Sequence, residues 1–494
     1  MSAHDDALKE LAKREEDRLA PGGPARVNRH HRLGKKTARE RVLTLVDEGS
    51  FVELGSDVLH RHAAMSEVLA AQREPGDGLV AGIGSIDGRR VVLLAHEPTV
   101  LRGALGHAAS KKACRALDFA LEHKLAVVTL ADSDGVRVDE GPDAIDAYGD
   151  ILARIIRLRG VVPQITVALG LCVGAAAYAA ALNDWVGMVS EQSFLFITGP
   201  KVTKVVTGQD NDLESLGGAS MHSKVTGQCH AVLANEDAAL QWVRQLLGTL
   251  RPADPTLDPP GRETPELLSI IPAEERRAYD MRKLLKAVFD AGSVFELSAK
   301  HAGNLLTCMA RLGGRPVAVV ASQPMVSAGC LDILSSRKGA HFVRWASQVG
   351  LPIMTLVDVP GYLPGLEQEQ GGILPHGATL LDAYGSATTP RICLVVRKSY
   401  GGASVLSFSA QVRLGLPTAR VGIMGADAAM MVAFGPEPED ASSEELAERQ
   451  ARKQAWLTQH HHAWVPAESG YLDRIIHPSA ARAELHRVLC SLQA

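Results

Sequence analysis

Residues 164–176 read Gln-Ile-Thr-Val-Ala-Leu-Gly-Leu-Cys-Val-Gly-Ala-Ala, a hydrophobic run that enters a turn of small residues and then a helical stretch. Residues 391–403 read Arg-Ile-Cys-Leu-Val-Val-Arg-Lys-Ser-Tyr-Gly-Gly-Ala and have the same organisation. Both patterns are typical of a buried strand, a tight turn and a helix. The surrounding sequence predicts strands at 91–95, 126–131 and 164–169, and helices at 111–122, 144–158 and 174–182. This alternation predicts an α/β fold.

The two stretches belong to an internal repeat. Six residues recur after 226 positions: Gly88, Arg89, Val91, Ala95, Pro98 and Val100 match Gly314, Arg315, Val317, Ala321, Pro324 and Val326. The same spacing relates Lys112 to Lys338 and Asp132-x-x-Gly135 to Asp358-x-x-Gly361, and Gly174 matches Gly401 after 227 positions. A period of this length predicts two duplicated domains, because solenoid repeats are much shorter.

The regions outside the repeat suggest the domain boundaries. Residues 251–272 hold six prolines and are typical of an extended linker. We therefore expect an N-terminal helical and basic extension at 1–34, a first domain at 35–250, the linker at 251–272 and a second domain at 273–494. Residues 26–41 carry seven Lys and Arg side chains. These cations either form a solvated surface or attract a polyphosphate ligand.

The composition excludes several classes of protein. With 46% hydrophobic and 22% charged residues, the 494-residue chain can bury a large core. The formal net charge of −4 argues against a nucleic-acid partner. The seven scattered cysteines contain no C-x-x-C pair, which is typical of reduced thiols in the cytoplasm and gives no zinc ribbon. Residues 165–182 are uncharged, but their many Ala and Gly residues favour a buried strand and helix over a membrane span. The histidines at 460–462 fit a solvated helix better than a metal site.

The turns at the ends of the two hydrophobic runs suggest a chemistry. Backbone N–H groups at the start of a helix have no intrahelical partner and carry a partial positive charge. Small residues at 174–176 and 401–403 would let a substrate oxygen approach these groups. Two such turns would make two oxyanion holes, which suit a thioester enolate. Close packing of each turn onto its sheet would require the same small residues and is the alternative.

A different chemistry is also open at the first turn. Gly170-Leu-Cys-Val-Gly174 fits a nucleophile elbow with Cys in place of Ser. A hydrolase of this kind would use Cys172 as its nucleophile, with His222 or His230 brought close by the fold. A buried structural cysteine is the alternative interpretation.

Across residues 35–490 the sequence resembles the carboxyltransferase β-subunit of biotin-dependent acyl-CoA carboxylases, of the propionyl-CoA carboxylase type. The matching stretches in the first half are Thr37-Ala-Arg-Glu-Arg-Val, Gly76-Asp-Gly-Leu-Val, Phe196-Ile-Thr-Gly-Pro200 and Leu216-Gly-Gly-Ala219. In the second half they are Pro324-Met-Val, Asp358-Val-Pro-Gly361, His376-Gly-Ala378, Arg397-Lys-Ser-Tyr-Gly-Gly-Ala403 and Gly470-Tyr-Leu-Asp473.

The resemblance implies two tandem crotonase-like β-β-α spiral domains in a homohexameric ring. It also implies that the first domain binds acyl-CoA, that the second binds carboxybiotin, and that CO2 passes to the α-carbon of the acyl group without a side-chain nucleophile or a metal on this chain. The sequence lacks Ala-Met-Lys-Met, the usual context of a biotinylated lysine. A separate α-subunit with biotin carboxylase and biotin carrier functions would therefore supply carboxybiotin. The enzyme would be a cytoplasmic ligase or transferase without a nucleic-acid or membrane partner.

The resemblance also assigns site residues. It places the two oxyanion holes at Gly174 and Ala175 and at Gly402 and Ala403. The substrate pocket would be lined by Cys172, Tyr178, Gly135, Ser404 and Val405. The biotin side would be formed by Gly361, Tyr362, His376, Gly377 and Gly401.

The chain departs from the family pattern around these sites. The departures are Leu171, Val173 and Ala175 in the usual Gly-Pro-Cys-Ala-Gly-Gly-Ala, Asp134 and Val136 in Asp-Ser-Gly-Gly-Ala-Arg, and Pro375 in place of Arg. Val405 stands where short-chain carboxylases carry Asp, so we expect an apolar wall and a preference for propionyl-CoA or a larger acyl group over acetyl-CoA. Two alternatives stay open: a decarboxylase of a malonyl- or methylmalonyl-type thioester, and a catalytically degenerate paralogue that only completes a ring.

Overall fold

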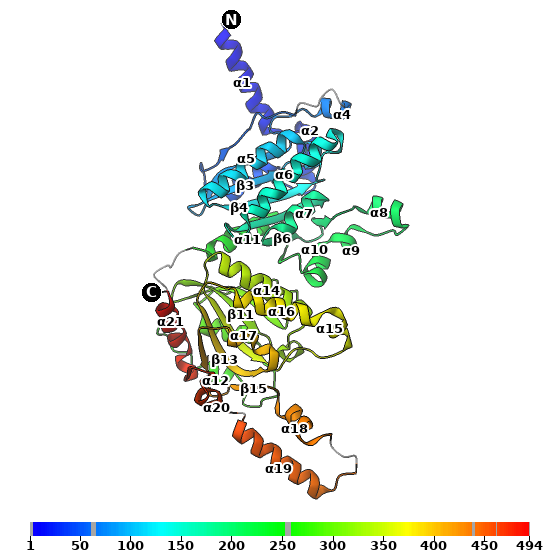
Figure 1. The fold of residues 1–494 in the computed structure, drawn as a ribbon. Coiled ribbons are helices and arrows are strands. Elements are labelled where there is room, and N and C mark those ends of the chain that lie inside the picture. Colours follow the sequence, from blue (N-terminus) through cyan, green and yellow to red (C-terminus); the bar gives the residue numbers. More distant parts are fainter. Residues whose placement is uncertain (1–2, 61–65, 252–257, 437–439, 461, 494) are drawn as a thin grey trace. The chain divides into compact units, whose positions relative to one another are not determined.

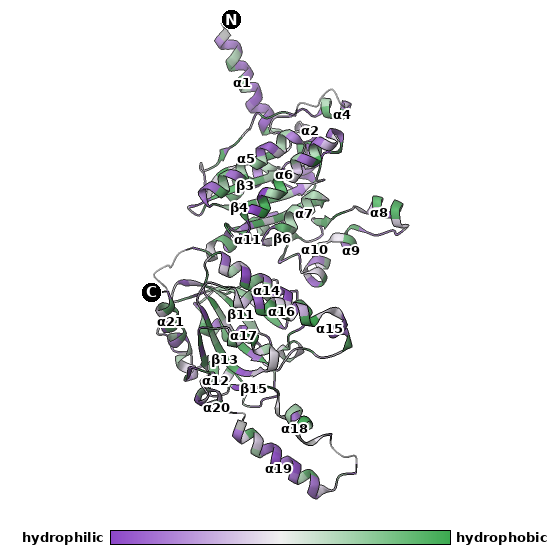
Figure 2. Cartoon of the chain, in the orientation of Figure 1, coloured by the Kyte–Doolittle hydropathy of each residue, from purple (hydrophilic) through white to green (hydrophobic). Residues whose placement is uncertain are grey.

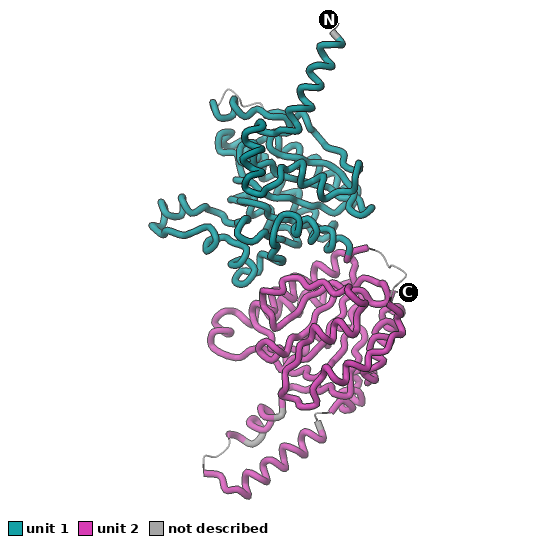
Figure 3. Tube along the Cα trace, turned by 180° about the vertical axis from the view of Figure 1, so that it is seen from behind, with its two compact units in different colours: residues 1–248 teal, residues 249–494 magenta. Residues whose placement is uncertain are grey.

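The computed structural model describes residues 3–60, 66–251, 258–436, 440–460 and 462–493. The chain divides into two compact units, Met1–Gly248 and Thr249–Ala494 (Figure 3). Each unit is built around one eight-stranded sheet flanked by helices (Figure 1). Within the described residues, none of the helices combines the length and the apolar character needed to span a membrane.

The sheet of unit 1 has the order β1-β2-β3-β4-β5-β6-β8, and β7 pairs with the end of β5. The pairs β1–β2 and β2–β3 are antiparallel, and the pairs from β3 to β8 are parallel. The strands are β1 (Val52–Glu53), β2 (Leu79–Ile86), β3 (Arg89–His96), β4 (Ala126–Ser133), β5 (Gln164–Val173), β6 (Trp185–Val189), β7 (Phe194–Phe196) and β8 (Ala231–Leu233). The helices are α1 (Ala3–Leu19), α2 (Pro24–Arg32), α3 (Ala38–Leu45), α4 (Glu67–Ala71), α5 (His107–His123), α6 (Pro142–Leu158), α7 (Ala175–Leu182), α8 (Pro200–Thr207), α9 (Leu213–Gly217), α10 (Ala219–Met221) and α11 (Glu236–Thr249).

The sheet of unit 2 repeats this order as β9-β10-β11-β12-β13-β14-β16, and β15 pairs with the end of β13. Its strands are β9 (Phe295–Leu297), β10 (Leu305–Leu312), β11 (Arg315–Ser322), β12 (Ile353–Val359), β13 (Arg391–Tyr400), β14 (Val412–Gly415), β15 (Arg420–Gly422) and β16 (Arg474–Ile475). Its helices are α12 (Leu267–Ile270), α13 (Met281–Val288), α14 (Ile333–Gln348), α15 (Leu366–Gly371), α16 (Ile373–Gly385), α17 (Val405–Phe408), α18 (Ala426–Phe434), α19 (Ser443–His460), α20 (Trp464–Glu468) and α21 (Ala481–Leu492). The duplicated α/β fold and all six predicted segments are confirmed.

The repeat extends to individual contacts. The Nζ atom of Lys112, on α5, donates to the Leu79 carbonyl at 2.6 Å. The Nζ atom of Lys338, on α14, donates to the Leu305 carbonyl at 2.7 Å, and Leu305 lies 226 positions after Leu79. Each buried lysine thus ties a helix to the first strand of its hairpin. Burial lowers the pKa of both ammonium groups to about 8.

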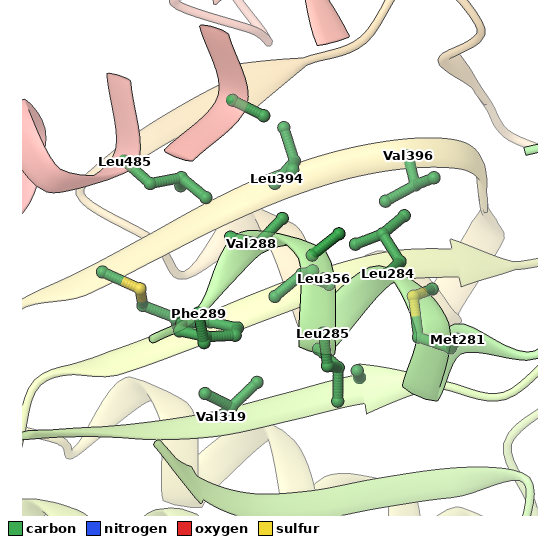
Figure 4. Packing of buried hydrophobic residues seen from close by; sticks show 14 of the residues in the cluster. Met281, Leu284, Leu285, Val288, Phe289, Val319, Leu356, Leu394, Val396 and Leu485 are labelled. Atoms are coloured by element: carbon green, nitrogen blue, oxygen red, sulfur yellow. The ribbon is translucent and has the colours of Figure 1, made fainter. Parts of the chain in front are cut away.

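Both sheets are built from apolar residues (Figure 2). In unit 2, α13 turns one face toward the sheet, because its apolar residues recur every three or four positions. Met281, Leu284 and Leu285 from this helix meet strand residues such as Val319 and Leu394 in a fully buried cluster (Figure 4). The sheet that carries the second turn therefore rests on a dry core.

The Pro-rich segment packs onto unit 2 where it is described. Leu267 is fully buried in the core of that unit. The Thr264 hydroxyl donates to the Pro478 carbonyl at 2.7 Å, and Arg482 donates to the Pro259 carbonyl at 3.0 Å. Residues 258–272 therefore form part of unit 2 and are not a free linker, because their apolar side chains and carbonyl groups find partners there.

Candidate functional site

The first turn lies between β5 and α7. Gly174 has a φ of 56° and a ψ of −116°, a conformation that other residues rarely adopt. Its amide donates to the Phe196 carbonyl at 3.0 Å, so Gly174 shapes the turn but has no free N–H. The amides of Ala175 and Ala176, at the start of α7, make no hydrogen bond within the described part of the chain. Of the two residues predicted for this oxyanion hole, Ala175 therefore has an unbonded N–H group and Gly174 does not, and Ala176 has an unbonded N–H group as well.

The loop after β4 braces this turn. Gly135 has a φ of 85°, and a Cβ atom there would lie 2.4 Å from the Val173 carbonyl oxygen and 3.5 Å from the Ala175 nitrogen. The Gly135 amide donates to the Ser133 hydroxyl at 3.0 Å, and that hydroxyl donates to the Gly103 carbonyl at 2.7 Å. Gly135 thus lies against the turn through its backbone.

The second turn lies between β13 and α17. Gly401 has the same φ of 56° as Gly174, which places Gly402 and Ala403 in register with Ala175 and Ala176. The chain here forms a 3₁₀ turn over Gly401–Ser404 before the short helix α17. Gly402 is exposed, whereas Ala403 is fully buried. Ala176 was not among the predicted site residues, although the one-residue shift in the repeat aligns it with Ala403.

Tyr362 lies against both Gly402 and Gly377. A Cβ atom on Gly402 would lie 3.7 Å from the Tyr362 ring, and one on Gly377 would lie 3.1 Å from its hydroxyl oxygen. Burial raises the pKa of the Tyr362 phenol. Gly361 precedes this residue, and His376 stands next to Gly377 in the first turn of α16. Pro375 is tolerated beside them, because the first turn of a helix needs no N–H from that residue.

Ser404 and Val405 lie inside unit 2. Val405 is 2% exposed, so its side chain faces the interior. The expected apolar wall is therefore not presented on the surface of this unit. The Ser404 hydroxyl accepts a hydrogen bond from Ser399 at 3.1 Å. Ser399 and Ser404 belong to a buried hydroxyl cluster that supports the turn from below.

Cys172 does not have the surroundings of a nucleophile. Its side chain is fully buried among Ala131, Ala168 and other apolar residues. Burial raises the pKa of the thiol, whereas a nucleophilic cysteine needs a lowered pKa and access to substrate. His222 is bonded to the Leu195 carbonyl at 2.8 Å, and His230 accepts the Val186 amide at 2.9 Å. The hydrolase interpretation is wrong. Tyr178, on α7, is 50% exposed near the same turn.

A buried charge cluster supports the first turn. The Asp132 carboxylate lies 3.2 Å from Arg41 and 3.3 Å from Lys35, and Arg41 also binds Glu236 at 2.6 Å. In unit 2, the matching Asp358 is bound by Arg397 at 2.8 Å. Arg41 and Lys35 were not predicted as supports of the site, because they lie outside the repeat and far from Asp132 in the sequence.

Most of the cationic side chains at residues 26–41 form ion pairs with carboxylates. Ion pairs link Arg41 to Asp132 and Glu236, Lys35 to Asp132, Arg39 to Glu53, and Lys36 to Asp237. Arg29 and Arg32 are exposed and form no ion pair within the described ranges. Most of the stretch thus binds the first unit together and is not available to a polyphosphate.

No three His, Cys, Asp or Glu side chains are grouped so as to hold a metal ion among the residues that the structure describes. His461, in the middle of the histidine run, lies outside them.

Comparison with known proteins supports the same interpretation of the fold. The carboxyl transferase domain family matches residues 29–492. The propionyl-CoA carboxylase beta chain of Roseobacter denitrificans is 39% identical over 98% of this chain and 97% of its own length. The mitochondrial propionyl-CoA carboxylase beta chain of Rattus norvegicus is 40% identical over 96% of this chain and 88% of its own length.

A solved structure of the transcarboxylase 12S hexamer, with methylmalonyl-coenzyme A bound, superposes with a TM-score of 0.93 and 36% identity. The superposition covers 99% of this chain and 96% of that one. Its parallel-rich sheets and those described above are tandem crotonase-like domains. The chain therefore belongs to the carboxyl transferase domain family, as a carboxyltransferase subunit of the propionyl-CoA carboxylase type.

Proposed function

We propose that the first turn holds the carbonyl oxygen of an acyl-CoA thioester and that the second holds carboxybiotin, so that CO2 reaches the α-carbon of the acyl group. The observation that carries this proposal is the match between the two turns. Gly174 and Gly401 share a φ of 56°, and each is followed by two small residues at the head of a helical turn. The relatives named propionyl-CoA carboxylase support the choice of acyl-CoA.

In this proposal Ala175 and Ala176 donate their amides to the thioester oxygen. Negative charge grows on that oxygen as the α-proton leaves, and preorganised N–H donors stabilise it without moving. Ala175 lies at the start of α7 and is not among the residues with positive φ, so its N–H keeps the helical direction. Gly135 and Ser133 hold the turn in place from the β4 side.

On the biotin side, the residues fit a flat ring with an exposed oxygen. Gly402 is exposed and presents no side chain, and the Tyr362 ring lies against it. Gly402 and Ala403 would hold the ring oxygen through their amides. When bound, carboxybiotin supplies the CO2 and takes up the α-proton. The chain itself therefore needs no general base.

We assign acyl-CoA to the domain at 35–250 and carboxybiotin to the domain at 273–494. The biotin carrier is a separate α-subunit, since this sequence lacks the Ala-Met-Lys-Met context. A homohexamer is proposed from the hexamer assembly of transcarboxylase 12S. Streptavidin blotting of this chain after expression with a biotin ligase should be negative, and a positive blot would contradict the separate carrier.

The central test is a carboxylation screen with the purified oligomer and a carboxylated biotin carrier protein. We expect product with propionyl-CoA or a larger acyl-CoA and little with acetyl-CoA. A preference for acetyl-CoA would contradict the proposed substrate. An intact oligomer that binds CoA but carboxylates none of the acyl-CoAs would support a degenerate, ring-completing paralogue.

A decarboxylase is the second candidate, because one relative has that name. The alpha subunit of the methylmalonyl-CoA decarboxylase of Propionigenium modestum is 38% identical over 98% of this chain and 95% of its own length. The same turns would serve the reverse reaction, since an enolate forms in both directions. Rapid loss of CO2 from methylmalonyl-CoA to an uncarboxylated carrier, without detectable carboxylation of propionyl-CoA, would favour it.

A further inference from the structure

Unit 1 carries a charged pair beside its first turn that unit 2 lacks. Arg102 follows β3, and Asp134 follows β4. The Nε atom of Arg102 forms an ion pair with the Asp134 carboxylate, and the Asp134 amide donates to the Arg102 carbonyl at 3.1 Å. The residues 226 positions later are Ala328 and Pro360, so the same backbone carries no charge in unit 2.

The shape of the backbone does not explain the arginine. Leu101 and Arg102 have φ values of 47° and 53°, and Gly103 follows with 66°. The matching Ser327 and Ala328 have φ values of 47° and 54°. Both units therefore hold the same strained turn with different side chains. The backbone of this turn therefore forms without an arginine and does not require Arg102.

The Arg102 guanidinium group is held by the Asp134 carboxylate but keeps further N–H donors. Arg102 has a side chain that is 83% exposed, whereas that of Asp134 is 24% exposed. The carboxylate takes the Nε side of the guanidinium. The two terminal nitrogens make no hydrogen bond to the residues that the structure describes, so their four N–H groups face solvent as a planar fork.

The pair stands next to the proposed thioester site. Asp134 directly precedes Gly135, whose backbone lies against Val173 and Ala175. On the other side, Ser133 is bonded to Gly103, which directly follows Arg102. These contacts place the pair beside the turn that would hold the thioester oxygen at Ala175.

We propose that Arg102 is a substrate-binding residue that recognises a phosphate of the thioester's carrier arm, and that Asp134 is its positioning residue. The inference rests on the proposed function of the first turn. A guanidinium fork binds phosphate oxygens through parallel, charge-assisted hydrogen bonds, which a lysine or a neutral side chain does not reproduce. Coenzyme A carries a diphosphate and a 3′-phosphate, and a carrier-protein arm carries one phosphodiester, so both sources offer this chemistry.

The test compares Arg102→Gln with the wild-type oligomer on three thioesters: propionyl-CoA, propionyl-phosphopantetheine and propionyl-pantetheine. We expect the KM for propionyl-CoA to rise about tenfold with an unchanged kcat, as for the loss of one charge-assisted contact. The KM for propionyl-pantetheine, which has no phosphate, should stay the same. An effect on propionyl-phosphopantetheine would assign the contact to the phosphate next to pantetheine, and an effect on CoA alone would assign it to the nucleotide phosphates.

The controls separate this inference from the proposed function. Arg115→Gln removes another exposed arginine of unit 1 and should change neither constant. Asp134→Asn keeps an acceptor for Nε and should bind propionyl-CoA better than Asp134→Ala. Calorimetric binding of CoA gives a readout without turnover. If the wild type binds no CoA, the proposed function fails; if the wild type and Arg102→Gln bind it equally, or if all three thioesters lose affinity equally, only this inference fails.

Discussion

Asp132 and Asp358 occupy the same place in the two sheets, but their charges are balanced in different ways. In unit 2 the partner is Arg397, from the neighbouring strand β13. The matching position in unit 1 is Gly170, where a Cβ atom would lie 2.0 Å from the Asp132 carboxylate. Asp132 is paired instead with Arg41 and Lys35, which precede the repeat in the sequence. The two units therefore share the carboxylate but take its counter-ion from different segments.

Because of this difference, the carboxylate beside the first turn depends on the segment from Lys35 to Arg41. The carboxylate beside the second turn is paired within its own sheet. Arg41 joins α3 to both β4 and α11, because it binds Asp132 and Glu236 at once. Lys35 adds a second cation at 3.3 Å. The segment from Lys35 to Arg41, which precedes the repeat, is thus part of the support of the first turn, although no repeat motif identifies it.

The largest effect should follow from removing a buried counter-ion. Arg41→Ala leaves the carboxylates of Asp132 and Glu236 buried without their main partner, and we expect a loss of about 3–5 kcal/mol in unfolding free energy. Arg397→Ala should cost a similar amount, because it strands Asp358. Urea unfolding of both variants measures this. A loss below about 1 kcal/mol for Arg41→Ala alone would show that Lys35 suffices and that the two sites are less alike than the contacts indicate.

The next effect concerns the exposed amides. Gly402→Val places a branched side chain over the second turn and should lower kcat about 10²–10³-fold, the usual cost of losing an oxyanion donor. Gly402→Ala is the matched control for stability, since its Cβ atom would lie at an ordinary 3.7 Å from Tyr362. Steady-state rates with intact oligomers decide the matter. Full activity in Gly402→Val would remove the second turn from the mechanism.

The paired lysines give a pH test. Burial holds the pKa of Lys112 and Lys338 at about 8 in the folded state, below the 10.5 of a lysine side chain in the unfolded chain. Between about pH 8 and pH 10.5 the unfolded chain binds more protons than the folded chain. The unfolding free energy therefore rises with pH, because the cost of burying each charged ammonium group is progressively lost. The unfolding free energy of the wild type should gain up to about 3 kcal/mol over Lys112→Met between pH 7 and pH 10. Lys338→Met should behave in the same way, and parallel pH profiles of variant and wild type would contradict both.

The sequence predicted the duplicated sheets well, because strand and helix periodicities are local and the repeat supplies each of them twice. It also located both turns. It could not show which amides of the first turn are unbonded, since the Gly174 amide donates to the Phe196 carbonyl on β7, a pairing that only the folded sheet brings about. The partner of Asp132 was equally hidden, because Arg41 lies 91 residues away in the sequence. Both contacts join residues that are far apart in the sequence, so local sequence patterns could not predict them.

The smallest effect separates a structural cysteine from a catalytic one. Cys172 matches Ser399 in the repeat, and both lie beneath their turns. Cys172→Ala removes one buried atom from an apolar cluster and should cost about 1 kcal/mol of stability. Ser399→Ala should cost about the same, because it removes the hydrogen bonds to Ser404 and Ser407 at 3.1 Å. We expect both variants to keep kcat within about twofold, since the proposed donors are backbone amides, which neither substitution removes. Loss of all activity in Cys172→Ala, with a stable oligomer, would make the thiol the reacting group and break the correspondence between the two turns.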